Sequence, residues 1–227
     1  MLPFTTEQFF QVFVEYNRTV WPAQWLLWLA GAAALAGAIV RPRLGSRIAL
    51  IVLACLWLWM AFAYHLAFFA RINPLARVFA VVFAAEGLLL AWRAARRASP
   101  ELALRRTPRD LTGLAFALFG LVVYPLLNSL FGHRFPAAPG FGLPCPTTLF
   151  TLGILTLGKP RADRLLLVVP TAWSMLGLSA ALNLGVRLDL SLVVAAAWGV
   201  WLIARPAAPT GRPIGSRERS DRASARR

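Results

Sequence analysis

The chain has 227 residues, of which 59% are hydrophobic and 15% are charged, and its formal net charge at pH 7 is +15. So few charged residues cannot cover a globule of this length, and the composition excludes an ordinary water-soluble domain. Nucleic acid is not the expected partner of the positive charge, because membrane topology explains nearly all of that charge and no aromatic residue interleaves the arginines of the C-terminal tail.

The first predicted element is an amphipathic helix at residues 5–18. Thr5 and Gln8 have the spacing of a capping box, and polar and apolar residues follow on two stripes: Gln8, Gln11, Glu15 and Arg18 on one, Phe9, Phe13, Tyr16 and Val20 on the other. Residues 1–17 hold no Lys or Arg, so we expect no cleavable signal. The helix is expected to lie along the outer membrane surface or to cap the bundle.

Seven apolar segments follow, at about residues 22–40, 48–69, 74–92, 111–131, 146–158, 165–182 and 188–204. A hydrocarbon core about 30 Å thick requires roughly 20 apolar residues in a helix, so the fifth segment is the doubtful one and six spans result if it does not cross. The predicted fold class is all-α, a polytopic transmembrane helical bundle. One domain covers residues 1–204, and a basic tail predicted to be disordered covers residues 205–227.

Arginines fall in alternate gaps between these segments. The positive-inside rule then places the N-terminus outside and the C-terminus inside. Anionic lipids are the expected partners of the basic inner loops and tail, in addition to the bilayer itself. The preference for Arg over Lys, with abundant Ala, is typical of a GC-rich bacterial genome, so the expected location is the bacterial inner membrane. The inner segments hold Arg41, Arg43, Arg47, Arg93, Arg96, Arg97, Arg105, Arg106, Arg109, Lys159, Arg161, Arg164 and the tail.

Polar residues gather at the outer ends of the predicted spans. The candidate outward-facing site consists of His65, Asn128, His133, Cys145 and Thr147. Amides and tyrosines also gather at any membrane interface because one end of the side chain can be wet, so this pattern has a purely structural alternative. The other polar residues at these ends are Tyr64, Asn73, Tyr124, Arg134, Asn183, Arg187 and Asp189.

Cys145 lies between Pro144 and Pro146, where a helix is expected to begin. A helix dipole there favours a thiolate, which serves as a nucleophile or as a ligand for a soft metal ion. The alternative is that the prolines only end a loop and start a short helix. Cys55 is expected near the inner end of its span, as a small buried apolar residue too far from Cys145 for a disulfide.

Glu86 is the one acidic residue deep within a predicted span, where a charged side chain costs at least about 2.5 kcal/mol. It is the candidate intramembrane proton or ion site. Two alternatives stay open: a protonated carboxyl bonded to the hydroxyl of Thr156, or a carboxylate that reaches the inner interface beside Arg93.

Several short strings stand out along the chain: Tyr16-Asn17, Val20-Trp21-Pro22-Ala23-Gln24, Tyr64-His65, Phe68-Phe69-Ala70-Arg71-Ile72-Asn73-Pro74 and Pro144-Cys145-Pro146-Thr147-Thr148. They resemble those of an uncharacterised family of bacterial multi-pass membrane proteins. The resemblance covers about Phe4 to Ala204 and implies membrane location and the pattern of spans, with no substrate or catalytic residue to carry over.

Three functional hypotheses follow. The first is a transporter or carrier of a small solute or soft metal ion, with Glu86 coupling protons. The second is a membrane scaffold, in which the N-terminal helix and the aromatic residues of the second span pack against a protein partner or another copy. The third, an enzyme that uses the Cys145 thiol with His133 as its base, has the least support. No cofactor is predicted.

Overall fold

The computed structural model describes residues 3–96, 101–158 and 164–205, and every regular element within them is helical. The predicted basic tail lies outside the described residues from 206 onward. The elements are α1 (Thr6–Val20), α2 (Ala23–Val40), α3 (Pro42–Trp59), η1 (Met60–Leu66), η2 (Phe69–Arg71), α4 (Ala76–Ala95), α5 (Pro108–Leu118), η3 (Phe119–Val123), α6 (Tyr124–Leu130), α7 (Pro144–Thr156), α8 (Leu165–Leu184), η4 (Arg187–Asp189) and α9 (Leu190–Ala204).

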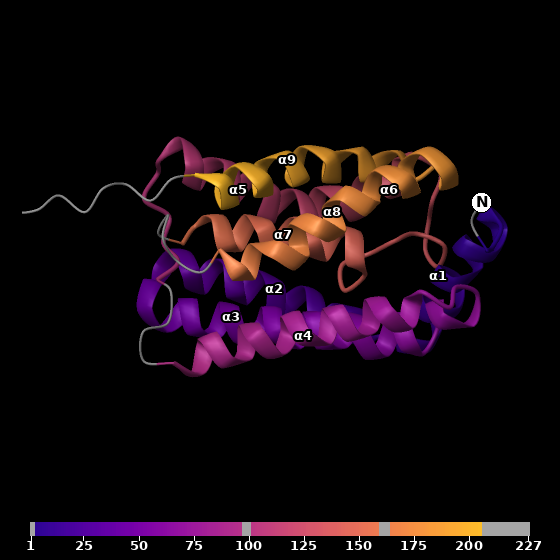
Figure 1. Cartoon of the computed structure of the whole chain (residues 1–227), viewed down its shortest axis with the longest axis horizontal. Coiled ribbons are helices and arrows are strands. Elements are labelled where there is room, and N and C mark those ends of the chain that lie inside the picture. Colours follow the sequence, from indigo (N-terminus) through magenta and orange to yellow (C-terminus); the bar gives the residue numbers. More distant parts are fainter. Residues whose placement is uncertain (1–2, 97–100, 159–163, 206–227) are drawn as a thin grey trace, which may run out of the picture.

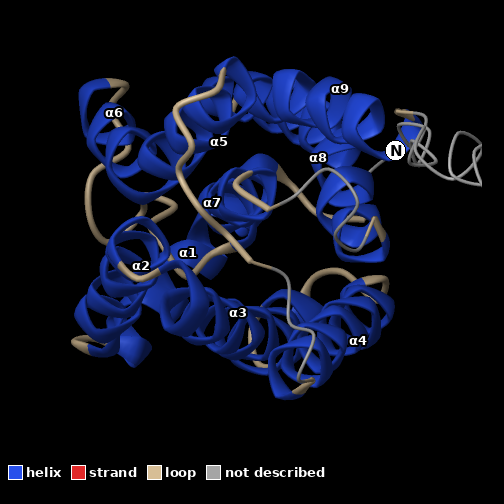
Figure 2. Cartoon of the chain, turned by 90° about the vertical axis from the view of Figure 1, so that its left-hand side faces the viewer, coloured by secondary structure: helices blue, strands red, loops and turns tan. Residues whose placement is uncertain are grey.

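The long helices run side by side along the longest axis of the molecule, and α1 lies at one end (Figure 1). Viewed along that axis, the other helices surround α7 (Figure 2). All residues of α7 except Cys145 are buried. A helix that is apolar all round belongs in the core, so α7 is the central element on which the others pack.

Six helices within the described residues are long and apolar enough to cross a membrane. They cover six of the seven predicted segments: Ala23–Val40, Pro42–Arg71, Ala76–Ala95, Pro108–Leu130, Leu165–Leu184 and Arg187–Ala204. The fifth predicted segment becomes α7, whose 13 residues extend only about 20 Å. The sequence pattern could not decide this case, because a short buried helix and a short span are equally apolar.

Glycines bring α7 against α5 and η3. A Cβ added at Gly153 of α7 would lie 2.4 Å from the backbone nitrogen of Ala117 and 2.5 Å from the carbonyl oxygen of Gly113. A Cβ at Gly120 would lie 2.3 Å from the carbonyl oxygen of Pro146. Small residues that allow such close backbone approach are typical of helix contacts in membranes.

Two π-helical segments interrupt the long helices. Segment η1 continues α3 and carries Tyr64 and His65, and segment η3 precedes Tyr124 at the start of α6. π-Helical turns often occur at functional sites because they change the direction in which side chains point. Both segments here place an aromatic residue near the α1 end of the bundle.

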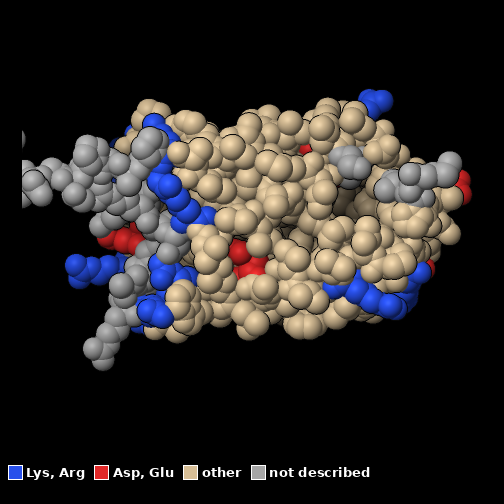
Figure 3. Space-filling model, in the orientation of Figure 1, with Lys and Arg blue, Asp and Glu red and all other residues tan. Residues whose placement is uncertain are grey.

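Arginine side chains gather at the two ends of the molecule, and the face between them is mainly uncharged (Figure 3). The end opposite α1 carries more of them and is called the arginine end below. Its described arginines are Arg41, Arg43, Arg47, Arg93, Arg96, Arg105, Arg106, Arg109, Arg164 and Arg205.

Candidate functional site

The N-terminal turn of α7 forms the centre of the candidate site. Gly142 takes a φ of +94°, a backbone conformation that favours glycine, and Leu143 precedes the helix in an extended conformation. The hydroxyl of Thr147 accepts a hydrogen bond from the backbone nitrogen of Gly142 (3.0 Å). This loop closure, together with Pro144 in the first turn, places Cys145 within the first turn of α7.

Asp189 joins Cys145 to Tyr124 in a buried polar cluster. The hydroxyl of Tyr124 donates to Oδ1 of Asp189 (2.5 Å), and the thiol of Cys145 donates to Oδ2 (3.3 Å). Tyr124 and Asp189 are fully buried. The carboxylate lies beside the N-terminal turn of α7, where the helix dipole favours negative charge.

A mostly apolar cavity of about 250 Å³ lies beside this cluster. This is slightly below the roughly 300–1,000 Å³ of common small-molecule sites. Its apolar wall comes from α1, α4, α7 and α8, and its polar groups come from Tyr64, Asn73 and Cys145. The site therefore suits a small apolar molecule that carries a hydrogen-bonding group.

Helix α1 closes the cavity from the end of the bundle. Phe9 and Phe13, on the predicted apolar stripe, line it, and the predicted capping box of Thr5 and Gln8 is present. Tyr16 fixes the helix to the bundle, because its hydroxyl accepts a hydrogen bond from Nε1 of Trp59 (2.6 Å).

The same hydroxyl donates to the carbonyl oxygen of Gly142 (3.5 Å) in the loop before α7. Burial raises the pKa of Tyr16 above its ordinary value, while the hydrogen bond from Trp59 acts in the opposite direction. The neutral phenol is therefore the form that holds α1 in place.

His65 lies behind the inner wall of the cavity. Aromatic rings surround its imidazole, and the nearest are Phe83 (4.5 Å between ring centroids), Tyr64 (5.1 Å) and Trp173 (5.3 Å). Neither ring nitrogen has a hydrogen-bond partner among the described residues. Tyr64 and Trp173 also line the cavity, so these two rings separate its space from the imidazole.

Glu86 is buried in α4, one turn beyond Phe83, and neither carboxyl oxygen has a hydrogen-bond partner in the described part of the chain. The alternative prediction, a hydrogen bond between the Glu86 carboxyl and the hydroxyl of Thr156, is therefore wrong. The hydroxyl of Thr156 donates to the carbonyl oxygen of Leu152 (2.7 Å) and accepts from Nε1 of Trp198 (3.1 Å). Two further buried hydroxyls without partners belong to Thr148 and Thr171.

The five predicted outward-facing residues do not form one cluster. Cys145 lines the cavity and Thr147 braces the loop before it. Asn128 donates to the carbonyl oxygen of Pro139 (3.1 Å) in that loop. His133 stacks on Phe10 of α1 at 4.6 Å between ring centroids.

No set of three or more metal-ligating side chains occurs among residues 3–96, 101–158 and 164–205. The partner of Cys145 is Asp189, not the base His133 that the enzyme hypothesis requires. The sequence placed Asp189 at the outer ends, but 44 residues separate it from Cys145, and nothing local indicates that the two side chains meet.

Cys55 also differs from expectation. Burial is predicted for this residue, yet its side chain is exposed on α3. The adjacent residues Ala54 and Leu56 are buried, because the helical period directs them toward the core while Cys55 points outward.

The C-terminal end of α7 meets arginines. Nη1 of Arg105 donates to the carbonyl oxygen of Leu157 (3.2 Å), and Nη1 of Arg109 donates to that of Gly158 (2.5 Å). Cations near a helix C-terminus complement its dipole and satisfy carbonyl groups that the helix leaves unpaired.

These features define an all-helical protein whose described residues include six helices able to cross a membrane. The chain belongs to DUF6064, a family of unknown function, which it matches over residues 6–211. This confirms the resemblance to an uncharacterised family. No curated protein and no solved structure matches the chain.

Proposed function

We propose that the protein is a multi-pass carrier of the bacterial inner membrane that binds a small, mainly apolar molecule with a hydrogen-bonding group. The observation that supports this most directly is the cavity beneath α1, with the Cys145 thiol in its wall and Asp189 behind that thiol. Apolar lining with a few placed polar groups is the usual composition of a small-molecule site.

In the proposed orientation, α1 and the cavity face outward and the arginine end faces the cytoplasm. The positive-inside rule supports this arrangement, because the arginine end holds most of the described arginines. The molecule would then enter from the outer side, beside the apolar stripe of α1.

Buried polar groups without partners support a transport step. Beyond the cavity, His65, Glu86 and Thr171 lie on the neighbouring helices η1, α4 and α8, and each has a polar atom that makes no hydrogen bond within the described residues. Such groups are costly inside a membrane and typically mark ion or proton pathways. Glu86 is the proposed proton-coupling residue.

The scaffold hypothesis has less support. It assigns the aromatic residues of the second predicted span to a partner, but those side chains pack mainly within the chain. Trp57 is fully buried, Tyr64 and Phe68 are buried with α1, and only Phe62 is more than half exposed. The remaining exposed apolar surface suits lipid.

The binding step is tested in membrane vesicles with N-ethylmaleimide and octan-1-ol as the probe. In the Cys55→Ala variant, octanol is expected to slow the labelling of Cys145 several-fold, because it occupies the cavity. In the Cys145→Ala variant, the labelling of Cys55, which is exposed on the side of α3 that faces away from the bundle, reports any general effect of octanol on the bilayer. Equal slowing at both cysteines would refute binding in the cavity.

A matched pair of substitutions in α8 sharpens the test. Leu176 lines the cavity, whereas Leu178, two residues away, is similarly exposed and does not. Leu176→Trp should slow the labelling of Cys145 without octanol, and Leu178→Trp should leave it unchanged. If both slow it alike, the cavity is not the route to the thiol.

The transport step is tested separately with a membrane-impermeant maleimide on intact cells and on inside-out vesicles. A carrier exposes its site to each side in turn, so Cys145 should react from both sides, and Glu86→Gln should change the ratio of the two rates. If Cys145 is labelled only from the outside, both with Glu86 intact and in Glu86→Gln, the carrier proposal is refuted and the protein only binds its ligand.

A further inference from the structure

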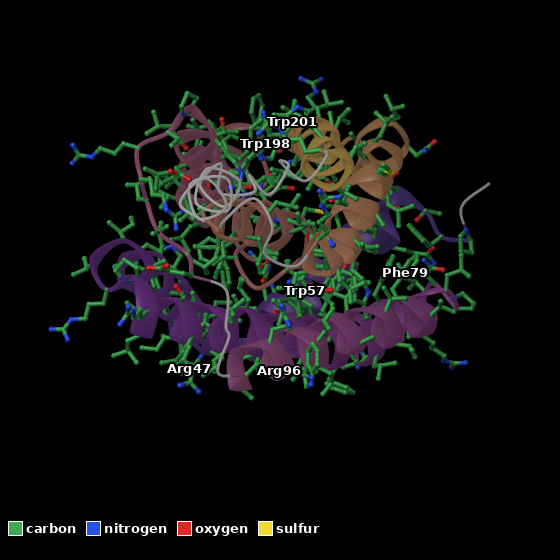
Figure 4. All side chains as sticks on the ribbon, turned by 60° about the vertical axis from the view of Figure 1, so that its left-hand side comes forward. Arg47, Trp57, Phe79, Arg96, Trp198 and Trp201 are labelled. Carbon is green, nitrogen blue, oxygen red and sulfur yellow. The ribbon has the colours of Figure 1, made fainter. Side chains whose placement is uncertain are left out.

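A second cleft, of about 590 Å³, lies at the arginine end between the start of α5 and the end of α9. Its walls include Arg105, Thr107, Arg109, Trp198, Trp201 and Arg205. In Figure 4, Trp198 and Trp201 lie on one side of the molecule, and Arg47 and Arg96 lie on the opposite side.

The cleft is lined by three arginines and a single acid, Asp110. Arg109 interacts electrostatically with Asp110 and also with Arg105 and Arg205. The nearest carboxylate, Asp110, accepts hydrogen bonds from the backbone nitrogens of Arg105 (2.9 Å) and Thr107 (3.3 Å), so it serves the cap of α5. Among the described residues, none of the three arginines forms a salt bridge.

Unused donors remain on these guanidinium groups. Nε of Arg109 is buried and has no hydrogen-bond partner in the described part of the chain. The guanidinium of Arg205 lies over the ring of Trp201, 3.8 Å from its centroid. Guanidinium groups match phosphate oxygens with paired N–H donors, so this cluster has the chemistry of a phosphate site.

The cleft also borders the apolar surface of the bundle. Trp198 and Trp201 stack at 4.5 Å between ring centroids, and Leu111 of α5 and Val200 of α9 are exposed apolar residues. Tryptophan is enriched where a membrane meets water, and basic pockets between membrane helices bind anionic headgroups. A phosphate held here would have hydrocarbon chains beside it.

We propose that this cleft binds the phosphate headgroup of an anionic glycerophospholipid, whose acyl chains lie along α5 and α9. The site is at the opposite end of the bundle from the cavity and is independent of the proposed carrier function. Because the arginines that line it also hold the end of α7, the bound lipid would fix the central helix in place.

The test is native mass spectrometry of the full chain in detergent, titrated with phosphatidylglycerol or with phosphatidylcholine of the same acyl chains. The first phosphatidylglycerol should bind more tightly. Each basic residue contributes about 1 kcal/mol near anionic lipid, so Arg205→Gln should weaken it about 5-fold, and Arg105→Gln with Arg205→Gln about 30-fold. Equal binding of the two lipids would overturn the proposal.

Arg96→Gln is the matched control, because Arg96 also stacks on a tryptophan at the arginine end, 4.0 Å from the centroid of Trp92. It should leave phosphatidylglycerol binding unchanged, and an equal loss would reduce the effect to general charge. Inorganic phosphate should not displace the lipid at equal concentration; displacement would assign the cleft to a soluble anion. If the double variant does not fold, the binding measured with Arg205→Gln alone tests the proposal. This single variant should fold, because the guanidinium of Arg205 makes no hydrogen bond within the described residues.

Discussion

The two ends of α7 contact side chains of opposite charge. At its N-terminus, the carboxylate of Asp189 accepts a hydrogen bond from the thiol of Cys145, and an apolar cavity lies beside them. At its C-terminus, Arg105 and Arg109 donate to the last carbonyl groups. Both arrangements follow the helix dipole, positive at the first turn and negative at the last. A short central helix can therefore support two different sites, provided that it stays in register with its neighbours.

A substitution that displaces the whole of α7 should disrupt the contacts at both of its ends, and we expect it to have the largest effect on stability. Gly153→Val adds atoms where even a Cβ would lie 2.4 Å from the backbone nitrogen of Ala117. We expect a loss of about 3 kcal/mol or more, seen as a large drop in the thermal unfolding midpoint. Gly140→Ala is the control, because a Cβ there has no atom within 4 Å. Similar midpoints for both variants would contradict the close packing of α5 on α7.

Asp189→Ala should disturb only the N-terminal end. It leaves the hydroxyl of Tyr124 and the thiol of Cys145 without their acceptor, which costs roughly 1–3 kcal/mol in a buried site. The unfolding midpoint should fall, and Tyr124→Phe combined with Asp189→Ala should cost less than the sum of the two single changes. Strict additivity would show that the two side chains are not coupled.

Arg109→Gln should disturb only the C-terminal end and cost about 1 kcal/mol, since it removes one of the cations that α5 places beside the end of α7. The unfolding midpoint should fall slightly, and the reactivity of Cys145 should not change. A faster reaction of Cys145 with N-ethylmaleimide would mean that the two ends of α7 move together.

Much of the fold could be predicted from the sequence, because apolar length and arginine placement are properties of single segments. The capping box at Thr5 and the segment near residues 165–182 are examples, and the structure has both elements. The short fifth segment needed more than hydropathy, since burial around α7 depends on glycines such as Gly113 and Gly153 in two different helices.

The candidate site was harder to predict. Cys145 stood out because prolines and a helix start are local signals. Its partner Asp189 did not, because a contact across 44 residues leaves no local pattern. The histidines drew attention by residue type, yet the structure encloses His65 in aromatic rings and places His133 against Phe10. Residue type indicates which chemistry is available, whereas packing decides which groups meet.

The last predicted effect, as small as that of Arg109→Gln, concerns helix α1, which covers the N-terminal end of α7. Burial raises the pKa of Tyr16, so the neutral phenol stabilises the docked α1 fully below about pH 10, and this contribution is lost as the pH rises further. Tyr16→Phe should cost about 1 kcal/mol at pH 8, because it removes the acceptor of Trp59.

The pH dependence separates the hydrogen bond from the ionisation. Between pH 8 and pH 11 the unfolding midpoint of the wild type should fall more than that of Tyr16→Phe, which has nothing to ionise at this position. Trp59→Phe keeps the phenol but removes its donor, so its midpoint should still fall with pH as in the wild type. If Tyr16→Phe retains the full alkaline loss, other groups cause it, and α1 is held over the cavity by its phenylalanines instead of its phenol.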